Sequence, residues 1–285
     1  MKKVLVTGAT GFIGNYVINE LLKQHIEVIA TSSNEERAKQ QPWFENVKYI
    51  PLDFNFFDSA TNYFLYFAKP DAAIHLAWEG LTNYKSSFHL EKNLPKHKTF
   101  LKNLIEHGLK DLTVTGTCLE YGLKEGCLKE EMETSPSTPY AIAKDELRVY
   151  LQQLQEQYPF TFKWVRLFYM YGKGQNPNSL LSQLDRALKN GETVFNMSGG
   201  AQTRDYLPIT VVAENIIRIA LQIKTEGIIN CCSGVGITVN KFVQDYLKSI
   251  NKTIKLNLGY YPYTDYEPMH FWGNTTKLNK ALKEK

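Results

Sequence analysis

Two side chains near the middle of the chain have the types and the spacing for proton transfer. Tyr140 and Lys144 stand four residues apart in a segment, 139–157, that predicts a helix, so both side chains lie on one face. An ammonium group beside a phenol favours the phenolate and lowers the pKa of the phenol from about 10 toward working pH. The pair therefore predicts a general acid or base, Tyr140, tuned by Lys144. The same spacing also arises by chance on helix surfaces, so its context decides its meaning.

The N-terminal stretch TGATGFIG, residues 7–14, has three glycines at the spacing of a phosphate-binding turn, between an apolar run and a helical pattern. Gly8 permits a tight strand-to-helix turn, Gly11 lets the backbone approach a pyrophosphate, and Gly14 lets the helix pack closely on the strand. The phosphates would meet unpaired N–H groups at the helix N-terminus. We therefore predict a dinucleotide-binding turn, whose expected contact residues are Gly8, Thr10, Gly11, Phe12, Ile13 and Gly14.

Strand and helix patterns alternate along the first 170 residues. Strands are predicted at 3–6, 27–31, 48–51, 72–76, 112–115 and 161–168, and helices at 13–23, 94–106 and 139–157. This alternation predicts an α/β fold, a Rossmann-type doubly wound parallel sheet with helices on both faces.

The pattern changes beyond residue 171, where glycines and Pro177 break the chain into short pieces ahead of a helix at 211–223. Short strands and loops are expected to dominate there. The predicted organisation begins with a dinucleotide-binding domain at 1–170. A segment at 206–228 should pack back on this domain. The remaining residues, 171–205 and 229–285, should form a smaller C-terminal α/β substrate-binding region. The smaller region should close over the carboxyl ends of the strands, where open α/β sheets hold ligands.

Composition is that of an ordinary globular protein. The 285 residues are 43% hydrophobic and 22% charged, and 33 basic and 29 acidic residues give a formal net charge of +4 without a long basic block. Nucleic-acid and membrane-surface roles are therefore not expected, whereas an anionic small ligand is. With no apolar run long enough to span a membrane and no leader-like N-terminus, we expect a cytoplasmic protein.

The four cysteines have no metal-binding spacing. Cys118, Cys127 and the adjacent pair Cys231 and Cys232 lack a C-x-x-C pattern. We interpret them as buried free thiols and expect no metal site.

Taken in order along the chain, these motifs resemble the extended short-chain dehydrogenase/reductase superfamily, which includes the nucleotide-sugar epimerases, dehydratases and ketoreductases. The resemblance covers nearly the whole chain. It rests on TGATGFIG, His75-Leu76-Ala77, Thr117 four residues before Tyr121-Gly122, Tyr140 with Lys144, Val165-Arg166-Leu167-Phe168 with Tyr171-Gly172, and Arg204-Asp205-Tyr206.

The resemblance implies a role for each matching residue. Thr117 would hydrogen-bond the reacting carbonyl, Tyr140 would donate the proton, and Lys144 would bind the nicotinamide ribose. Hydride transfer to a ketone builds negative charge on oxygen, so donors and a proton are needed there. The other implied contacts are Leu76, Ala77, Trp78 and Asn93 along the coenzyme, Asp53 with its adenine, and Arg204 with the diphosphate of a nucleotide substrate.

The residues after Thr117 argue against dehydration. Sugar 4,6-dehydratases of this superfamily resemble one another in placing Asp-Glu there, whereas this chain has Cys118 and Leu119. Glu120 is interpreted as a polar loop residue rather than as a substitute acid. Two alternatives stay open: a 4-epimerase that recycles tightly bound NAD with the same three residues, and a non-catalytic protein that only binds the dinucleotide.

The segments 75–93 and 116–122 resemble those of ketoreductases that make deoxysugars from CDP- or dTDP-linked 4-keto-6-deoxyhexoses. We therefore expect NAD(P)H-dependent reduction of the C4 ketone of such a sugar, with dTDP as the expected nucleotide, in deoxysugar and surface polysaccharide biosynthesis. Trp78 and Tyr84 offer flat apolar surface to a sugar, although both also suit a core. The expected substrate contacts are Trp78, Tyr84, Thr117, Cys118 and Arg204.

Coenzyme choice depends on the end of the second strand, where an acid would bind the ribose 2′-hydroxyl of NAD. The run 30–34 has no acid but contains Ser32 and Ser33, with Arg37 nearby, so NADPH is the predicted coenzyme and NADH is expected to be usable.

The long helices at 94–106 and 141–155 predict a homodimer with a four-helix interface.

Overall fold

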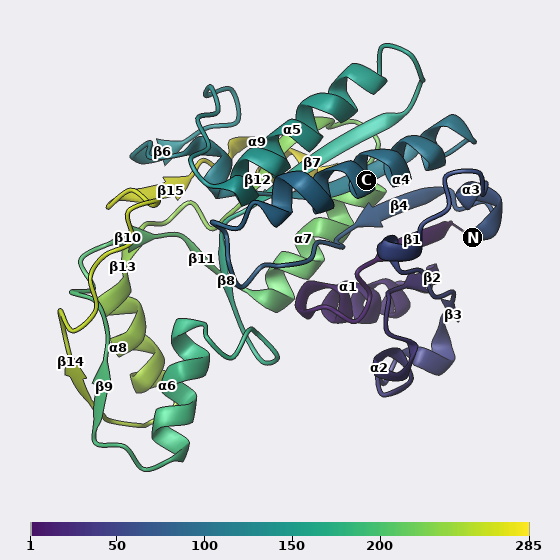
Figure 1. The fold of residues 1–285 in the computed structure, drawn as a ribbon. Coiled ribbons are helices and arrows are strands. Elements are labelled where there is room, and N and C mark those ends of the chain that lie inside the picture. Colours follow the sequence, from purple (N-terminus) through teal and green to yellow (C-terminus); the bar gives the residue numbers. More distant parts are fainter. Residues whose placement is uncertain (1, 285) are drawn as a thin grey trace.

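A seven-stranded parallel sheet forms the centre of the computed structural model, which describes residues 2–284 (Figure 1). The strand order is β12-β7-β5-β4-β1-β2-β3. The strands are β1 (Lys3–Thr7), β2 (Glu27–Thr31), β3 (Lys48–Tyr49), β4 (Ala72–His75), β5 (Asp111–Thr117), β7 (Thr161–Leu167) and β12 (Gly227–Cys231). Central strands such as β1 and β5 are buried along most of their length because both faces of the sheet are covered. The predicted fold class is therefore confirmed.

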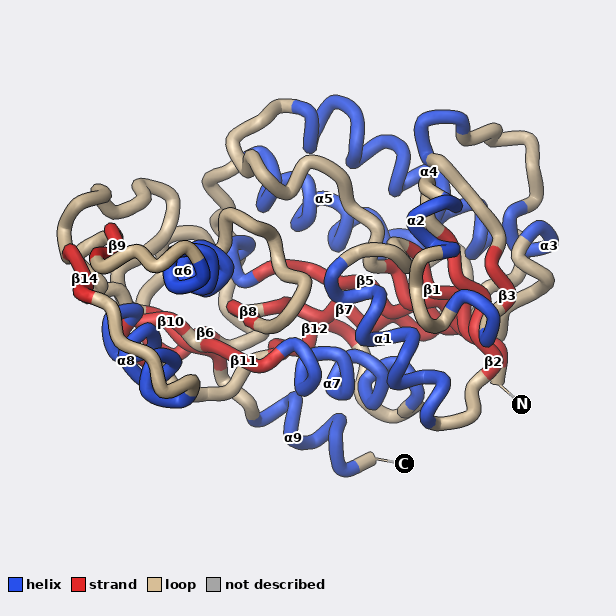
Figure 2. Tube along the Cα trace, turned by 90° about the horizontal axis from the view of Figure 1, so that it is seen from below, coloured by secondary structure: helices blue, strands red, loops and turns tan. Residues whose placement is uncertain are grey.

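Helices cover the two faces of the sheet, as the view along the sheet shows (Figure 2). One face packs on α1 (Phe12–Lys23), α7 (Ile209–Leu221) and α9 (Thr276–Lys283). The other packs on α3 (Tyr63–Tyr66), α4 (Leu94–Glu106) and α5 (Pro139–Leu154). Along β7 the side chains alternate between the faces, with Val165 in the first core and Trp164 in the second. The short α2 (Glu35–Lys39) follows β2 at the sheet edge.

The C-terminal region contains more helix than predicted. It forms a lobe of α6 (Leu180–Lys189), α8 (Val239–Ser249) and the paired strands β9 (Val194–Asn196) and β14 (Lys255–Asn257), at the lower left of Figure 1. Leu181, Leu184 and Ala187 recur at helical spacing and bury one face of α6 against α8. The expectation of mainly short strands and loops was therefore wrong, because the glycines of this region lie outside its helices.

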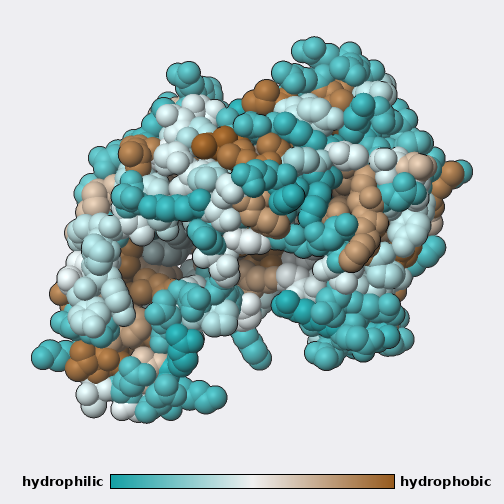
Figure 3. All heavy atoms as spheres, in the orientation of Figure 1, coloured by the Kyte–Doolittle hydropathy of each residue, from teal (hydrophilic) through white to brown (hydrophobic). Residues whose placement is uncertain are grey.

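Short strand pairs connect the lobe to the main sheet. They are β6 (Gly126–Leu128) with β15 (Phe271–Gly273), β8 (Tyr169–Tyr171) with β11 (Tyr206–Pro208), and β10 (Thr203–Arg204) with β13 (Ile237–Thr238). The space-filling view shows a mainly hydrophilic face with a hollow between the larger body and the lobe (Figure 3). No helix within residues 2–284 is long and apolar enough to cross a membrane.

Candidate active site

A cleft of about 520 Å³ opens at the carboxyl ends of β1, β4, β5 and β7, where a parallel sheet presents its loops. Most of the residues predicted from the sequence line it together. They are Gly8, Thr10, Gly11, Phe12, Ile13, Gly14, Ser32, Ser33, Arg37, Leu76, Ala77, Trp78, Tyr84, Asn93, Thr117, Cys118 and Tyr140. Three predicted residues, Asp53, Lys144 and Arg204, are not among its lining side chains.

Two of the three glycines in the turn leave no room for a side chain. Gly8 has a φ of +69°, and a Cβ there would lie 2.8 Å from the amide nitrogen of Ala77. A Cβ on Gly14 would lie 2.3 Å from the Gly8 carbonyl oxygen, whereas one on Gly11 would meet the same oxygen at 3.1 Å. Gly11 is the N-cap of α1 without a side-chain cap, so the first N–H groups of the helix are open to an anion at the cleft.

Two alanine substitutions should separate folding from phosphate binding. We expect Gly14→Ala to destabilise the fold by about 1–3 kcal/mol, because its Cβ overlaps backbone that cannot move alone. Gly11→Ala should keep the wild-type stability but weaken dinucleotide binding about tenfold, because its Cβ obstructs the pyrophosphate. Thermal unfolding and fluorescence titration with NADH measure the two effects. Equal affinity of Gly11→Ala and wild type would contradict the assignment of the turn.

Thr117 stands where β5 turns into the 3-10 helix η4 (Cys118–Tyr121). Its hydroxyl accepts a hydrogen bond from the Leu119 amide at 3.3 Å, while its own amide donates to Glu120 Oε1 at 2.8 Å. This reciprocal capping box fixes the end of β5. Thr117 is thereby held with its side chain in the cleft lining, next to the thiol of Cys118.

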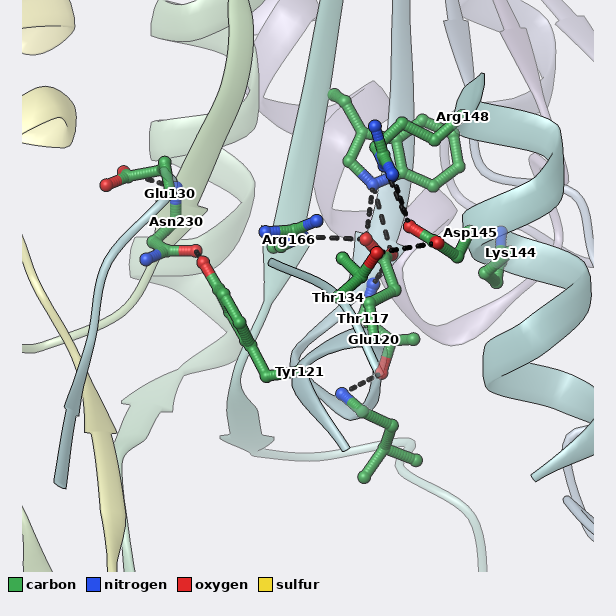
Figure 4. A network of polar contacts seen from close by, with 12 residues as sticks. Thr117, Glu120, Tyr121, Glu130, Thr134, Lys144, Asp145, Arg148, Arg166 and Asn230 are labelled. Carbon is green, nitrogen blue, oxygen red and sulfur yellow. Dashed lines mark hydrogen bonds and ion pairs between the residues drawn. The ribbon is translucent and has the colours of Figure 1, made fainter. Parts of the chain in front are cut away.

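Glu120 is a buried structural acid, so its interpretation as a polar loop residue was wrong. Arg166 Nε donates to Glu120 Oε2 at 2.6 Å (Figure 4). Trp164 Nε1 lies 3.0 Å from both carboxylate oxygens. Trp164 and Arg166 lie two residues apart on β7 and so point to the same side. Burial raises the pKa of Glu120, and the Arg166 charge opposes that rise.

Tyr140 lies in the first turn of α5, which Thr138 caps through a 3.2 Å hydrogen bond from the Ala141 amide. Its ring stacks on Tyr84 with centroids 4.9 Å apart, and its amide donates to the Tyr84 carbonyl at 3.1 Å. Burial raises the pKa of Tyr140 well above its ordinary value, and the Thr117 side chain opposes the rise. The phenol is therefore protonated at neutral pH.

Lys144 lies deeper than Tyr140, behind Trp78. Its Nζ donates to the Thr115 carbonyl at 2.9 Å and lies 4.2 Å from the centre of the Trp78 ring. Burial lowers the pKa of Lys144 to about 7, and Glu120 opposes the fall. The expectation that Lys144 lowers the pKa of Tyr140 was wrong for this structure, because burial dominates at Tyr140 and Lys144 is not among its perturbing charges.

Asp53 and Arg204 have other partners than those predicted. The Asp53 carboxylate caps its own 3-10 turn by accepting from the Asn55 amide at 2.8 Å, while the flanking Leu52 and Phe54 line the cleft. Arg204 is buried and donates to Glu267 Oε2 at 2.9 Å. Glu267, unlike Arg204, is among the residues that line the cleft. The ligand roles of Asp53 and Arg204 stay predictions.

The cleft also has lining residues that the sequence analysis missed. Among them are Thr31, Glu79, His97, Tyr169 and Glu267. His97 lies four residues after Asn93 and shares its helix face, a spacing that could have revealed it. Glu267 has no local signal, because only the fold of the C-terminal region brings it to the cleft.

The cysteines are free thiols, of which Cys118, Cys231 and Cys232 are buried and Cys127 is half-buried. Burial raises the pKa of Cys118 above its usual value, so the thiol in the cleft is neutral. Within residues 2–284, no three or more His, Cys, Asp or Glu side chains group as metal ligands.

The fold is an open parallel sheet with a glycine turn at a helix N-terminus, and Thr117 and Tyr140 lie in the same cleft as that turn. This combination defines a dinucleotide-binding α/β protein of the short-chain dehydrogenase/reductase type. The profile of the NAD dependent epimerase/dehydratase family matches residues 4–232, and the chain belongs to this family. The resemblance found in the sequence is thus confirmed.

Curated relatives include nucleotide-sugar enzymes of different activities. The chain is 28% identical over 271 residues to dTDP-6-deoxy-L-talose 4-dehydrogenase (NAD(+)) of Aggregatibacter actinomycetemcomitans, which covers 95% of this chain and 98% of the relative. It is 23% identical to UDP-arabinose 4-epimerase 1 of Arabidopsis thaliana, over 98% of this chain and 74% of that protein. Relatives of this kind leave the particular reaction open.

Solved structures share the fold. UDP-glucuronic acid 4-epimerase from Bacillus cereus, in complex with UDP-glucuronic acid and NAD, superposes with a TM-score of 0.85 at 20% identity, covering 99% of this chain and 93% of that one. UDP-N-acetylglucosamine 4-epimerase from Methanobrevibacter ruminantium M1 gives a TM-score of 0.84 at 23% identity, covering 98% and 91% of the two chains. At these identities the likeness concerns the fold alone.

Proposed function

We propose that the protein reduces the C4 ketone of a nucleotide-linked 4-keto-6-deoxyhexose, with dTDP as the expected nucleotide, using a nicotinamide dinucleotide. The observation that carries this proposal is the meeting of Thr117 and Tyr140 with the glycine turn in one cleft. The relative from Aggregatibacter actinomycetemcomitans, a 4-dehydrogenase of a dTDP-linked 6-deoxyhexose by name, supports it over nearly the whole chain. The product would be a 6-deoxyhexose donor for surface polysaccharide.

The residues of the cleft fit a dinucleotide. Gly8 and Gly14 leave no space for a Cβ against neighbouring backbone, which keeps the turn tight enough to present its N–H groups to a pyrophosphate. Three buried polar atoms on cleft-lining residues, Thr31 Oγ1, Asn93 Oδ1 and Tyr169 Oη, lack a hydrogen-bond partner within the described part of the chain. Such atoms favour a polar ligand beside them. When bound, the nicotinamide supplies or accepts the hydride.

The protonation states favour an acid role for Tyr140. Because its pKa is raised, Tyr140 holds a proton that it can give to the C4 oxygen, while the Thr117 hydroxyl stabilises the charge that develops there. Lys144, half-protonated near pH 7, would bind the nicotinamide ribose. These roles are those of a ketone reductase.

Dehydration lacks a base at the positions where the dehydratases have one. Cys118 is a neutral buried thiol and Leu119 is apolar. Glu120 is held by Arg166 and Trp164, away from any substrate. These three positions support reduction or epimerisation rather than elimination of water.

The choice between NADPH and NADH can be tested by substitutions at the adenosine end of the cleft. Ser32, Ser33 and Arg37 line it without an acid that would repel a 2′-phosphate. We expect Ser33→Ala and Arg37→Ala to raise the Kd of NADPH about tenfold and that of NADH much less. Equal losses of affinity for both coenzymes would contradict a preference for NADPH. NADH must be included in the comparison because the name of the Aggregatibacter actinomycetemcomitans relative specifies NAD(+).

The deciding experiment measures loss of nicotinamide absorbance with NADPH and NADH against dTDP-, CDP-, GDP- and UDP-linked 4-keto-6-deoxyhexoses, with product configuration determined by NMR. Net coenzyme oxidation with one nucleotide would support the reductase. Interconversion of C4 epimers without net oxidation would support the 4-epimerase instead. Dinucleotide binding without turnover on any carbonyl substrate would support a non-catalytic protein.

We also propose a homodimer with α4 and α5 at its interface. Val149 on α5 is an exposed apolar side chain, although the α4 and α5 surfaces also carry the Lys98–Glu146 ion pair at 3.7 Å. Sedimentation of the purified protein measures its oligomeric state.

A further inference from the structure

We propose that Trp78 is a positioning residue whose indole ring holds the Lys144 ammonium in place, and that two histidines kept neutral by their hydrogen bonds hold that ring. The inference rests on the role given to Lys144 in the proposed function. It starts from the surroundings of the ammonium, which is fully buried yet makes its hydrogen bond only to the Thr115 carbonyl among described residues. The Trp78 ring, 4.2 Å from Nζ, provides its other stabilising contact.

His89 fixes one edge of the indole. The Trp78 Nε1–H can only donate, and it donates to His89 Nδ1 at 3.1 Å, so Nδ1 is the accepting nitrogen. His89 Nε2 lies 3.0 Å from the Asn83 carbonyl oxygen, which can only accept. Both contacts require a neutral imidazole with its hydrogen on Nε2. Protonating Nδ1 would place two donors against each other and release the indole.

His97 stacks on the indole, with ring centroids 4.7 Å apart and planes inclined by 13°. Its tautomer follows from a chain of hydrogen bonds that begins at Thr7. The Thr7 hydroxyl accepts from two backbone amides after β4, at 3.2 and 3.3 Å, so its own hydrogen is left for His75 Nδ1 at 2.9 Å. His75 Nε2 then donates to His97 Nδ1 at 2.9 Å. Both imidazoles are neutral, in agreement with burial, which lowers the pKa of His75 to about 3.

The histidines must be neutral because the indole ring of Trp78, on which His97 stacks, also contacts the Lys144 ammonium. An imidazolium stacked on Trp78 would compete with Lys144 for the ring and repel its charge. The ionisable groups that interact with the Lys144 charge are His75, His89, His97 and Glu120. With the histidines neutral, Trp78 and Glu120 both favour the ammonium against the effect of burial. The ring thus favours the charged form of Lys144 and holds its Nζ over the indole face.

The test titrates Lys144 by NMR of ¹⁵N-labelled lysine side chains, with Lys144→Arg to assign its signal, in wild type, Trp78→Phe and Trp78→Leu. Because a tryptophan face attracts a cation more strongly than a phenyl face, the titration midpoints should fall in the order Trp, Phe, Leu, with Leu about one pH unit below wild type. Phe and Leu are similar in size, so a difference between them isolates the aromatic face from packing. Equal midpoints in all three proteins would overturn the proposal.

A second measurement needs no variant at position 78 and so does not depend on the variants folding. An ammonium over an indole places the ε-methylene protons of Lys144 in the shielding region of the ring, and their signals should lie upfield of those of other lysines. Ordinary ε-methylene shifts in the wild-type protein would overturn the proposal. Neither measurement requires substrate, so failure of the proposed reductase activity and failure of the Trp78 contact are distinguishable.

The pH dependence of enzyme activity distinguishes a positioning role of Trp78 from a purely structural one. The alkaline limb of the pH profile of kcat/KM should move to lower pH in Trp78→Leu and be largely restored in Trp78→Phe. A uniform loss of activity at every pH, with an unmoved limb, would instead identify Trp78 as a packing residue and overturn the proposal.

Discussion

Tyr140→Phe is expected to lower kcat by about a hundredfold or more while leaving dinucleotide binding nearly intact. The substitution removes a phenol that lines the cleft together with Thr117 and that, with its raised pKa, holds a proton to give. It retains the ring that stacks on Tyr84, so packing at the start of α5 is kept. Turnover by steady-state kinetics and coenzyme Kd by fluorescence titration measure the two effects separately.

Tyr84→Phe is the matched control for that experiment. It removes a phenol whose ring centre lies 4.9 Å from that of Tyr140, but Tyr84 touches Tyr140 through its ring and its backbone carbonyl. We expect a change mainly in KM for the control. Retained turnover in Tyr140→Phe, or an equal loss of kcat in both variants, would refute Tyr140 as the proton donor.

Glu120→Gln should destabilise the fold by about 3–5 kcal/mol, because it leaves the guanidinium of Arg166 buried without its counter-charge. Both side chains of this ion pair are fully buried, and Trp164 Nε1 also donates to the carboxylate. A loss of this size is a large part of the 5–15 kcal/mol that typically holds a protein folded. Urea unfolding at neutral pH measures the free energy of unfolding.

The surface ion pair between Lys98 and Glu146 provides the matched control. Its side chains are 31% and 52% exposed, so Glu146→Gln should cost less than about 1 kcal/mol. Replacing both buried partners, as in Glu120→Leu with Arg166→Met, should recover much of the stability lost in Glu120→Gln. A cost for Glu120→Gln no larger than that of the surface control would show that Glu120 does not stabilise the end of β5.

The elements with strong local periodicity could be predicted from the sequence. Strand β2 has the predicted bounds, 27–31, and α1 and α5 begin within one residue of theirs. By contrast β3 contains only two of the four predicted residues, since an edge strand has one neighbour to pair with. The glycine turn was readable because tight turns and close backbone approach demand glycine at fixed positions.

Pairs formed across the fold could not be predicted in this way. Glu120 and Arg166 are 46 residues apart, and Arg204 and Glu267 are 63 apart. No local pattern indicates that β7 turns Arg166 toward η4 or that the segment before β15 brings Glu267 to the cleft. The tautomers of His75 and His97 are likewise set by a contact that exists only once β4 and α4 pack together.

The sequence by itself determined the family and the parallel sheet and proposed Thr117, Tyr140 and Lys144 as the site, because side-chain period, turn chemistry and i, i+4 spacing are properties of neighbouring residues. Tertiary structure alone decided the charge states within the site. It buries Tyr140 and Lys144 so deeply that desolvation raises the pKa of the phenol and lowers that of the ammonium, opposite to the effect expected from their spacing. Desolvation depends on every atom that excludes water from a group, and those atoms come from all parts of the chain.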